Sequence, residues 1–261
     1  MPDLALPDVS LHYEATGSGP PLLLLAGMMS DGTSWAPLLP LLSQNFTLIY
    51  PDNRTTGRTT PWDAPASLEI YAQDALALMR HLGHARFHIA GHSLGGLIGL
   101  QILHKAPERV IDLSLLATAP MRLRRNISLF ENFIAIRRSS APEDTWLRAL
   151  FPWLFSTAFY DTPGAVDEAV AASLAYPFAQ STDAMVHQLS ALSRIDIDPL
   201  CGPYPVPVQA LLAEKDQMIP LDQAQSALAG ADIHTIADAG HSVHWDAPQE
   251  VAALITRFAK R

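Results

Sequence analysis

The amino-acid sequence predicts an α/β protein in which a mostly parallel sheet is covered by helices on both faces. Apolar stretches of strand length alternate with helical patterns, and most connections between them are short. Several stretches are apolar throughout rather than at every second residue, which indicates strands buried on both faces. The chain has 261 residues and 49% of them are hydrophobic, so it is long enough to bury such a core.

Strands and helices alternate from the start of the chain. The expected elements are an edge strand over 11–14, a strand over 22–25, a short helix over 35–42, a strand over 46–50 and a helix over 68–82. The run 22–25 is four leucines, which is typical of a strand with no exposed face. Ser67 precedes the longer helix and is its candidate N-cap, because a serine hydroxyl accepts from a free amide of the first turn.

The second half of the chain continues this alternation. The expected elements are strands over 86–90, 110–116, 206–212 and 233–236, a helix over 94–104 that Pro107 stops, and helices from about Leu221 and Pro248. The final helix carries an apolar face made of Val251, Leu254, Ile255 and Phe258. We therefore expect it to dock against the sheet.

Residues 121–195 interrupt the alternation with helical patterns, four prolines and no convincing strand. They hold half of the aromatic residues, which suits either an apolar lid over a pocket or a small core within the insertion. We expect 1–120 and 196–261 to form a core domain and 121–195 to form a helical cap. Candidate substrate contacts on this cap are Trp153, Phe130 and Phe155.

Charge, cysteine content and loop motifs exclude several classes of protein. The formal charge of −9 disfavours a nucleic-acid partner, because phosphate binding needs a basic surface. The lone Cys201 permits no internal disulfide, which favours a reducing compartment. Residues 1–4 show no signal-peptide pattern and the run 22–29 is too short for a membrane helix, so we expect a cytoplasmic protein without a membrane partner. No metal-ligand spacing or phosphate-binding glycine loop is present, and no cofactor is expected.

The segment Gly91-His92-Ser93-Leu94-Gly95 is the most informative in the chain. It lies between a predicted strand and a predicted helix, where Gly-x-Ser-x-Gly forms a sharp turn that presents a serine. The two glycines fit a crowded turn because they carry no Cβ. Ser93 is therefore the candidate nucleophile.

A serine hydroxyl needs a base to become nucleophilic near neutral pH, and histidine is the usual one. His241 lies between the last predicted strand and the last helix, where a loop can reach the strand ends. His244 is the alternative, but it enters the next helix, where packing or capping is the expected task. His92 is expected to support the turn beside Ser93. We therefore predict His241 as the general base.

An acid that orients the histidine is expected at the same edge of the sheet. Asp216 follows the strand over 206–212 and lies at its carboxyl end. Glu214 is the near alternative, and both also suit solvated loop positions. The residues after the strand over 110–116 offer no competing carboxylate. We therefore predict Asp216 as the acid.

The order Ser93, Asp216, His241 resembles that of the α/β-hydrolase superfamily, and the resemblance extends from about Leu11 to Phe258. It implies an α/β-hydrolase fold with a helical cap inserted after the sixth strand. In this family two backbone amides hold the oxyanion, one after the nucleophile and one after the third strand. Carried over to this chain, they belong to Leu94 and Met28.

Two loops depart from the family pattern. The oxyanion loop usually begins His-Gly, and this chain has Ala26-Gly27 there. The segment 52–59 looks like the family's Asp-x-Arg-Gly-x-Gly-x-Ser, with Thr55 at the first glycine and Thr59 at the serine. These changes affect the expected loop conformation and leave the chemistry in place.

The resemblance implies a serine hydrolase that cleaves a carboxylic ester or lactone of a small molecule through an acyl-enzyme intermediate. The chain looks most like small carboxylesterases and 3-oxoadipate enol-lactonases. Members similar to haloalkane dehalogenases and epoxide hydrolases carry aspartate where this chain has Ser93. Carbon–carbon bond hydrolases share the triad, and the scaffold also serves ligand receptors, so both remain alternatives. The oligomeric state is left open.

Five basic residues gather in the first part of the insertion. They are Arg122, Arg124, Arg125, Arg137 and Arg138. One of them could orient a substrate carboxylate by a bidentate contact, or the group could be solvated helix surface.

Overall fold

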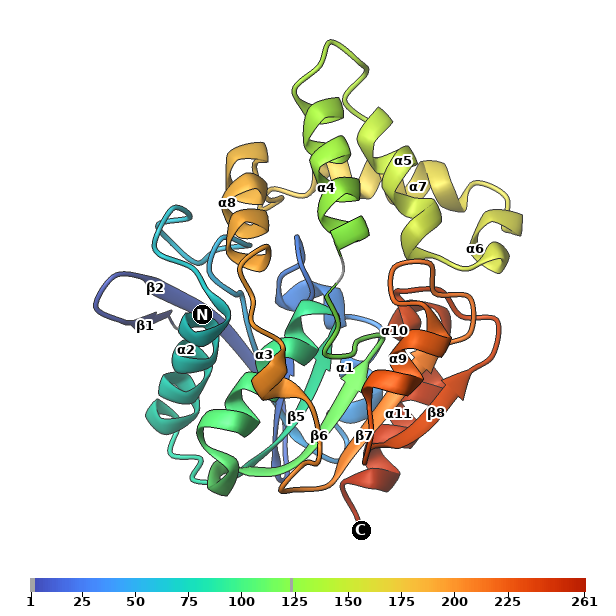
Figure 1. Ribbon diagram of the computed structural model, residues 1–261. Helices are drawn as coiled ribbons and strands as arrows, with labels where there is room; N and C mark the ends of the chain where they lie inside the picture. The colour runs from blue at the N-terminus through green and yellow to red at the C-terminus, as the bar shows by residue number, and fades with distance from the viewer. Residues whose placement is uncertain (1–2, 123) are drawn as a thin grey trace.

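The computed structural model describes residues 3–122 and 124–261, so Met1, Pro2 and Leu123, which belong to the N-terminal and cap expectations, lie outside the described residues. Within the described chain, eight strands form one sheet in the order β1-β2-β4-β3-β5-β6-β7-β8. Their bounds are Asp3–Ala5 (β1), Ser10–Gly17 (β2), Pro21–Leu25 (β3), Thr47–Pro51 (β4), Phe87–His92 (β5), Val110–Leu116 (β6), Val208–Ala213 (β7) and Asp232–Ile236 (β8). Only the β1–β2 and β2–β4 pairings are antiparallel, which confirms the predicted mostly parallel sheet (Figure 1).

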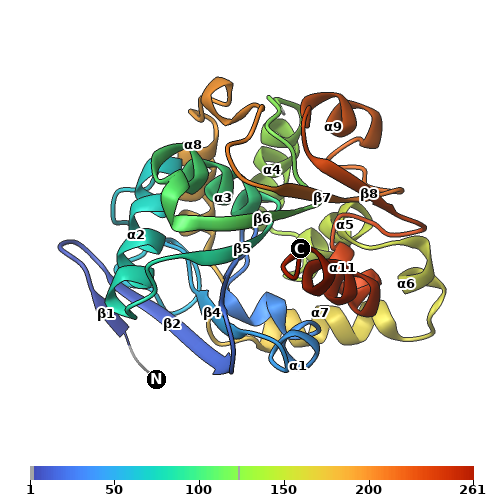
Figure 2. The same cartoon turned by 90° about the horizontal axis from the view of Figure 1, so that it is seen from below.

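Helices cover both faces of the sheet. The covering helices are Leu39–Leu42 (α1), Leu68–His81 (α2), Leu94–Lys105 (α3), Leu221–Ala227 (α9), Val243–Asp246 (α10) and Pro248–Phe258 (α11). Figure 2 shows α2, α3 and α9 on one face and α1 and α11 on the other. Each face has its own buried apolar cluster, and the predicted apolar face of α11 is buried. Ser67 caps α2, because its hydroxyl accepts from the amide of Ile70.

The register of the parallel strands brings their carboxyl ends to one edge. Leu25 of β3 lies opposite Gly91 of β5. Leu116 of β6 lies opposite both His92 of β5 and Leu211 of β7. The loops that follow β3, β5, β7 and β8 therefore meet at the same edge, which is where open parallel sheets bind their ligands.

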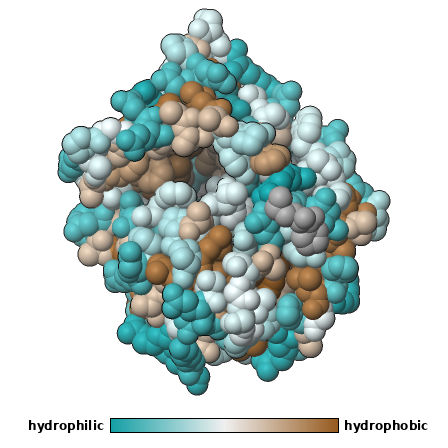
Figure 3. All heavy atoms as spheres, turned by 180° about the vertical axis from the view of Figure 1, so that it is seen from behind, coloured by the Kyte–Doolittle hydropathy of each residue, from teal (hydrophilic) through white to brown (hydrophobic). Residues whose placement is uncertain are grey.

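Among the described residues, five α-helices lie between β6 and β7. They are Arg124–Arg137 (α4), Thr145–Leu154 (α5), Thr157–Asp161 (α6), Ala165–Ala175 (α7) and Thr182–Leu192 (α8). They stand beyond the carboxyl ends of the strands (Figure 1), and Figure 3 shows the molecule hollowed beneath this layer, with apolar side chains around the hollow. Leu147, Phe151 and Val170 form a small core within the layer, whereas Phe133 and Leu150 belong to the main core. The boundaries 121–195 remain a prediction.

Two local expectations differ from the structure. The single helix predicted over 35–42 is wrong: a 3₁₀ turn at Gly32–Trp35 is followed by the short α1. Pro37 and Pro40 lack backbone N–H groups, so a continuous ladder of helical hydrogen bonds cannot form there. The three-residue β1 was not expected, because a strand so short shows no alternation.

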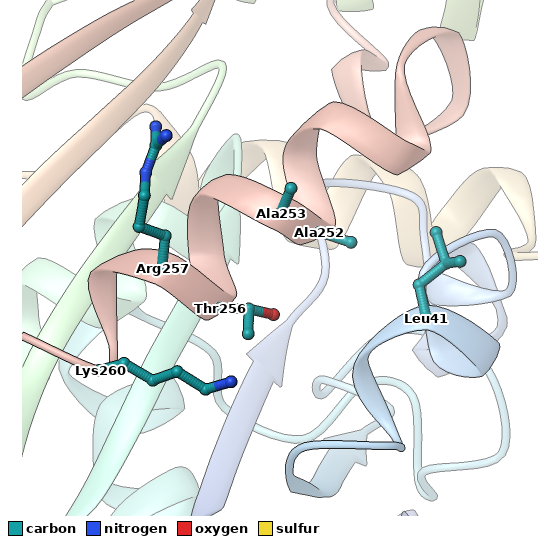
Figure 4. A pocket seen from close by; sticks show the side chains of 6 residues that line it. All are labelled: Leu41, Ala252, Ala253, Thr256, Arg257 and Lys260. Carbon is teal, nitrogen blue, oxygen red and sulfur yellow. The ribbon is translucent and has the colours of Figure 1, made fainter.

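A shallow hollow of about 510 Å³ lies between α1 and α11 (Figure 4). Its walls are Leu41, Ala252, Ala253, Thr256, Arg257 and Lys260. None of the predicted catalytic residues belongs to it, so the candidate site lies elsewhere.

Membrane spans and metal clusters were also sought in the described ranges 3–122 and 124–261. No helix there combines the length and the apolar character needed to cross a bilayer. The same ranges hold no group of three or more histidine, cysteine or acidic side chains that could bind a metal ion.

Candidate active site

The turn between β5 and α3 places Ser93 at the edge of the sheet. Ser93 has φ +50°, an uncommon backbone conformation for a residue with a side chain. A Cβ on Gly91 would collide with the carbonyl of Gly95, and a Cβ on Gly95 would collide with the carbonyl of Leu25. Both glycines are therefore required for the turn, as the motif predicts, and the turn puts Ser93 on the wall of a large cavity.

His241 and Asp216 form a buried pair on the loops after β8 and β7. The distance between His241 Nδ1 and Asp216 Oδ2 is 2.9 Å. The other carboxylate oxygen, Oδ1, accepts from the amides of Met218 at 2.8 Å and Ile219 at 2.9 Å. An ionised carboxylate can only accept, so a neutral His241 carries its proton on Nδ1 and leaves Nε2 free to accept.

Glu214, the alternative acid, forms hydrogen bonds with groups other than a histidine. Its carboxylate accepts from the Asp238 amide at 3.0 Å and from Lys215 Nζ at 2.9 Å. These two donors lower the pKa of Glu214, and its side chain is 39% exposed. Glu214 is therefore a surface carboxylate of the loop, and Asp216 is the acid that contacts a histidine.

Three imidazole rings crowd behind Ser93. The His92 ring lies 4.9 Å from that of His241 and 4.5 Å from that of His244, which also packs 5.2 Å from the Trp35 ring. His92 donates from Nε2 to the carbonyl of His241 at 2.9 Å, since a carbonyl can only accept. His92 therefore ties the Ser93 turn to the His241 loop, a contact that only the structure reveals.

Burial keeps two of these three histidines neutral. Burial, and then the neighbouring His244 and His241, holds the pKa of His92 well below its usual range. Burial and the neighbouring His241 lower the pKa of His244 to about 3. A general base needs a pKa near the working pH, so neither His92 nor His244 suits that role.

The predicted oxyanion donors, Met28 and Leu94, line the same cavity as Ser93. Leu94 is the first residue of α3, where a helix leaves its amides without internal partners. Met28 follows Gly27, and a Cβ on Gly27 would lie 2.9 Å from His92 Nδ1 and 3.4 Å from Ser93 Cβ. Glycine therefore lets this loop approach the nucleophile, even though the preceding residue is alanine.

The cavity has a volume of about 820 Å³ and extends from the sheet edge into the helical layer. Of the candidate substrate contacts, Phe130 and Phe155 line it. Trp153 is not among the lining residues, and its ring instead packs against the Arg125 guanidinium, 5.8 Å from the ring centroid. The periodicity of an aromatic helix does not tell which of its rings faces a cavity.

Two of the five clustered arginines, Arg122 and Arg124, line the cavity. Arg122 is already paired with Asp198 at 3.1 Å. Arg137 is half-buried and does not line the cavity, donates to the carbonyl of Gln180 at 2.9 Å, and has its pKa lowered by burial. Arg138 pairs with Asp183 at 2.9 Å, so Arg137 and Arg138 make contacts within the helical layer, whereas Arg122 pairs with a residue outside it.

Two polar contacts, one on the cavity wall and one beside the His241 loop, could not be found from the sequence. Tyr176 of the insertion donates to Asp31 at 2.6 Å, and burial followed by this contact raises the pKa of Tyr176 to about 12. Asp246 accepts from the Gly240 amide at 2.7 Å and from the Ser156 hydroxyl at 3.1 Å, and burial raises its pKa. Apart from Gly240 and Asp246, the residues in these contacts lie far apart in the chain. No local sequence motif therefore predicts the contacts.

Comparison with known proteins finds a matching family and several similar proteins. A model of the alpha/beta hydrolase family matches residues 22–254. A protein from Azorhizobium caulinodans that carries the name carbamate hydrolase RutD is 31% identical over 216 residues, which cover 82% of this chain and 80% of that protein. An esterase from Thermogutta terrifontis superposes with a TM-score of 0.83 at 22% identity, covering 99% of this chain and 96% of the esterase. An enol-lactonase from Burkholderia xenovorans superposes with a TM-score of 0.85 at 22% identity, covering all of both chains. At this identity the two structures show a shared fold.

Proposed function

The chain belongs to the alpha/beta hydrolase family of enzymes, and on that premise we propose that it is a serine hydrolase for esters or lactones of small molecules. In this proposal Ser93 is the nucleophile, His241 the general base and Asp216 the residue that orients it. The amides of Met28 and Leu94 hold the oxyanion.

One observation carries the proposal. Ser93, on a turn that only glycines permit, shares a cavity wall with His241, whose Nδ1 is paired with Asp216 at 2.9 Å. The three residues come from loops far apart in the chain, and separate structural roles do not account for a serine and an acid-paired histidine on the wall of one cavity. This arrangement supports acyl transfer by an activated serine.

In the first step His241 Nε2 takes the proton of Ser93 as Oγ attacks the carbonyl carbon. The carbonyl oxygen gains negative charge, and the amides of Met28 and Leu94 stabilise it. Asp216 stabilises the imidazolium that forms. His241 then gives the proton to the leaving alcohol oxygen, and the carbon–oxygen bond breaks to leave an ester on Ser93.

In the second step water takes the place of the alcohol. His241 removes a proton from water, the hydroxide attacks the acyl carbon, and the same two amides hold the second oxyanion. The bond to Ser93 breaks, His241 returns the proton to Oγ, and the free acid leaves. No group outside the chain and water is needed for this balance.

The cavity supports a substrate with a sizeable apolar part. Its volume of about 820 Å³ and its aromatic and aliphatic walls, such as Phe130, Trp146 and Leu150, exceed the needs of a carbamate of few atoms. In this proposal residues 121–195 form a cap that shapes the apolar pocket, and 1–120 with 196–261 form the core that carries the chemistry. Small carbamates belong in the assay because a relative is named for them.

The test is turnover of p-nitrophenyl esters of increasing acyl length, aliphatic lactones and a small carbamate, together with mass spectrometry after treatment with a serine-directed phosphonate. We expect ester turnover, labelling at Ser93, and a loss of about 10⁵-fold or more in kcat for Ser93→Ala. Ser193→Ala is the matched control, because Ser193 lines the same cavity without a proposed role. Full activity in Ser93→Ala would refute the proposal.

A further inference from the structure

A chain of buried amides joins helix α8, orange in Figure 1, to the loop that holds Met28. Gln188 of α8 is fully buried, and its Oε1 accepts from the Met29 amide at 3.0 Å. The same Oε1 accepts from Gln180 Nε2 at 3.1 Å, and this Nε2 also donates to the carbonyl of Thr55 at 2.9 Å. Two loops of the sheet edge are thus tied to α8 and to the residue Gln180 just before it.

The orientation of both side-chain amides follows from their backbone partners. The Met29 N–H can only donate, so Gln188 must present its oxygen to it. The Thr55 carbonyl can only accept, so Gln180 must present its nitrogen, and its second N–H then points to Gln188. Every member of the chain is consistent with its neighbours, so the pair has a single arrangement.

Both backbone sites held by this pair have unusual conformations. Met29 has φ +63° and Thr55 has φ +75°, values that side chains disfavour and that persist only where the surroundings hold them. Thr55 stands where related sequences have glycine, and Gln180 holds the carbonyl of that residue. The pair therefore supports two conformations that the local sequence does not favour.

The Met29 contact selects one form of the oxyanion turn. The Ser30 amide donates to the Gly27 carbonyl at 3.3 Å, which closes a four-residue turn around Met28 and Met29. A positive φ at Met29 alone of the two central residues is the pattern of a type II turn. A flip of the peptide between Met28 and Met29 would give a type I turn. The Met28 carbonyl, rather than the Met29 N–H, would then point toward the Gln188 oxygen. That contact is repulsive, so Gln188 disfavours the flip.

We infer that Gln188 is a positioning residue for the oxyanion site and that Gln180 holds it in place. This inference rests on the proposed function, because it assigns the Met28 amide to the oxyanion. Gln188 touches no reacting atom and acts through the loop of Met28. The helical insertion thereby sets the geometry of the catalytic edge as well as the shape of the pocket.

The test replaces Gln188 with methionine, which keeps the length of the side chain and removes the acceptor. We expect kcat to fall about tenfold or more, with KM changed less than about threefold, because oxyanion contacts act in the transition state. Affinity for an aliphatic trifluoromethyl ketone, which forms an oxyanion on serine, should fall by the same factor as kcat. Gln188→Glu keeps an acceptor oxygen in either protonation state. This variant should therefore keep most of the kcat and most of the ketone affinity of the natural protein.

Gln209→Met is the matched control. Gln209 is also a buried glutamine, but it lies on β7 and donates to Ser114 at 2.7 Å, away from the cavity lining. The Gln209→Met variant should lose thermal stability as the Gln188→Met variant does. Its kcat and its affinity for the ketone should stay as in the natural protein. Equal kinetic losses in the two variants would mean that general destabilisation causes them, and the inference would be wrong.

Hydrogen exchange of the Met29 amide, followed by nuclear magnetic resonance, tests the anchor without any substrate. In the natural protein this amide should exchange about tenfold or more slowly than that of Met28, and Gln188→Met should remove the difference. Equal exchange at Met28 and Met29 in the natural protein overturns the inference, as does an unchanged kcat in a folded Gln188→Met protein that takes up the phosphonate. A natural protein with neither turnover nor labelling contradicts the proposed function instead, and exchange then supports or overturns the anchor by itself.

Discussion

Of the three neighbouring imidazoles, His244 shows most clearly why a buried histidine does not suit the role of general base. It lies on α10 against Trp35 and His92, with no solvent to stabilise a charge. Burial and His241 lower its pKa to about 3, so it stays neutral near neutral pH. A residue that cannot accept a proton near neutral pH packs and does not catalyse.

This neutrality has a consequence for stability. In the unfolded chain a histidine binds its proton near pH 6.5, whereas His244 in the folded chain does so only near pH 3. Between these values the unfolded state binds more protons, so the free energy of unfolding falls as the pH falls. His244 alone lowers the free energy of unfolding by about 2 kcal/mol between pH 7 and pH 5. His92 changes it in the same direction, because its pKa is also lowered.

We therefore predict that His244→Phe, which keeps a packed ring and removes the titrating group, loses less stability than the natural protein between pH 7 and pH 5. Urea unfolding at the two pH values measures the difference. The control is His104→Phe on the exposed face of α3, which should leave the pH dependence close to that of the natural protein. Parallel pH curves for His244→Phe and the natural protein would contradict the assigned neutrality.

At the scale of elements, the loop of His241 is held between α10 and the junction of α5 and α6. Asp246 of α10 accepts from the Gly240 amide at 2.7 Å and from Ser156 at the start of α6. The Ser242 amide donates to the carbonyl of Leu154 at the end of α5 at 2.7 Å. The proposed base, His241, is thus positioned by the insertion as well as by α10.

We predict that Asp246→Ala lowers the free energy of unfolding by about 2–3 kcal/mol, because it leaves the Gly240 amide and Ser156 without their acceptor. It should also lower kcat, since the His241 loop loses an anchor. Chemical denaturation and ester kinetics measure the two effects. Asp222→Ala, which removes an exposed carboxylate from the first turn of α9, is the control. If the two variants were equally stable, the anchoring role of Asp246 would be refuted.

At the scale of the whole molecule, the sheet edge carries the reactive groups and the helical layer builds the apolar space above them. The cavity runs from Ser93 and His241 to side chains of α4, α5, α7 and α8. Its size allows an acyl chain of many carbons, and each buried methylene contributes about 0.8 kcal/mol, or about fourfold in kcat/KM. Under the proposed function, we therefore expect the helical layer to set the selectivity among esters.

We predict that kcat/KM for p-nitrophenyl esters rises with acyl length and that Ala172→Trp, which fills part of the cavity from α7, removes the preference for long chains. Short esters should react nearly as before. Ala253→Trp is the control, because Ala253 is also an exposed helical alanine but lines the shallow hollow on α11. A flat profile in the natural protein, or equal effects of the two variants, would show that this cavity does not hold the acyl chain.

The sequence predicted best what depends on near neighbours in the chain. The turn around Ser93 needs glycines two positions to each side, and that spacing is visible without a structure. It was harder to predict which aromatic side chains of the insertion face the cavity. Phe155 lines it, whereas Trp153, two positions earlier, packs against Arg125. Which side of such a helix faces a ligand depends on its packing partners.

The amino-acid sequence by itself determined the alternation of strands and helices, the turn that presents Ser93, and the loops of Asp216 and His241, because each is encoded by residues close together in the chain. Only the tertiary structure decided which acid meets which histidine, which ring faces the cavity, and how Gln188 reaches the Met29 amide. Those contacts join positions up to 159 residues apart, and the free energy of packing, which no short segment contains, selects them.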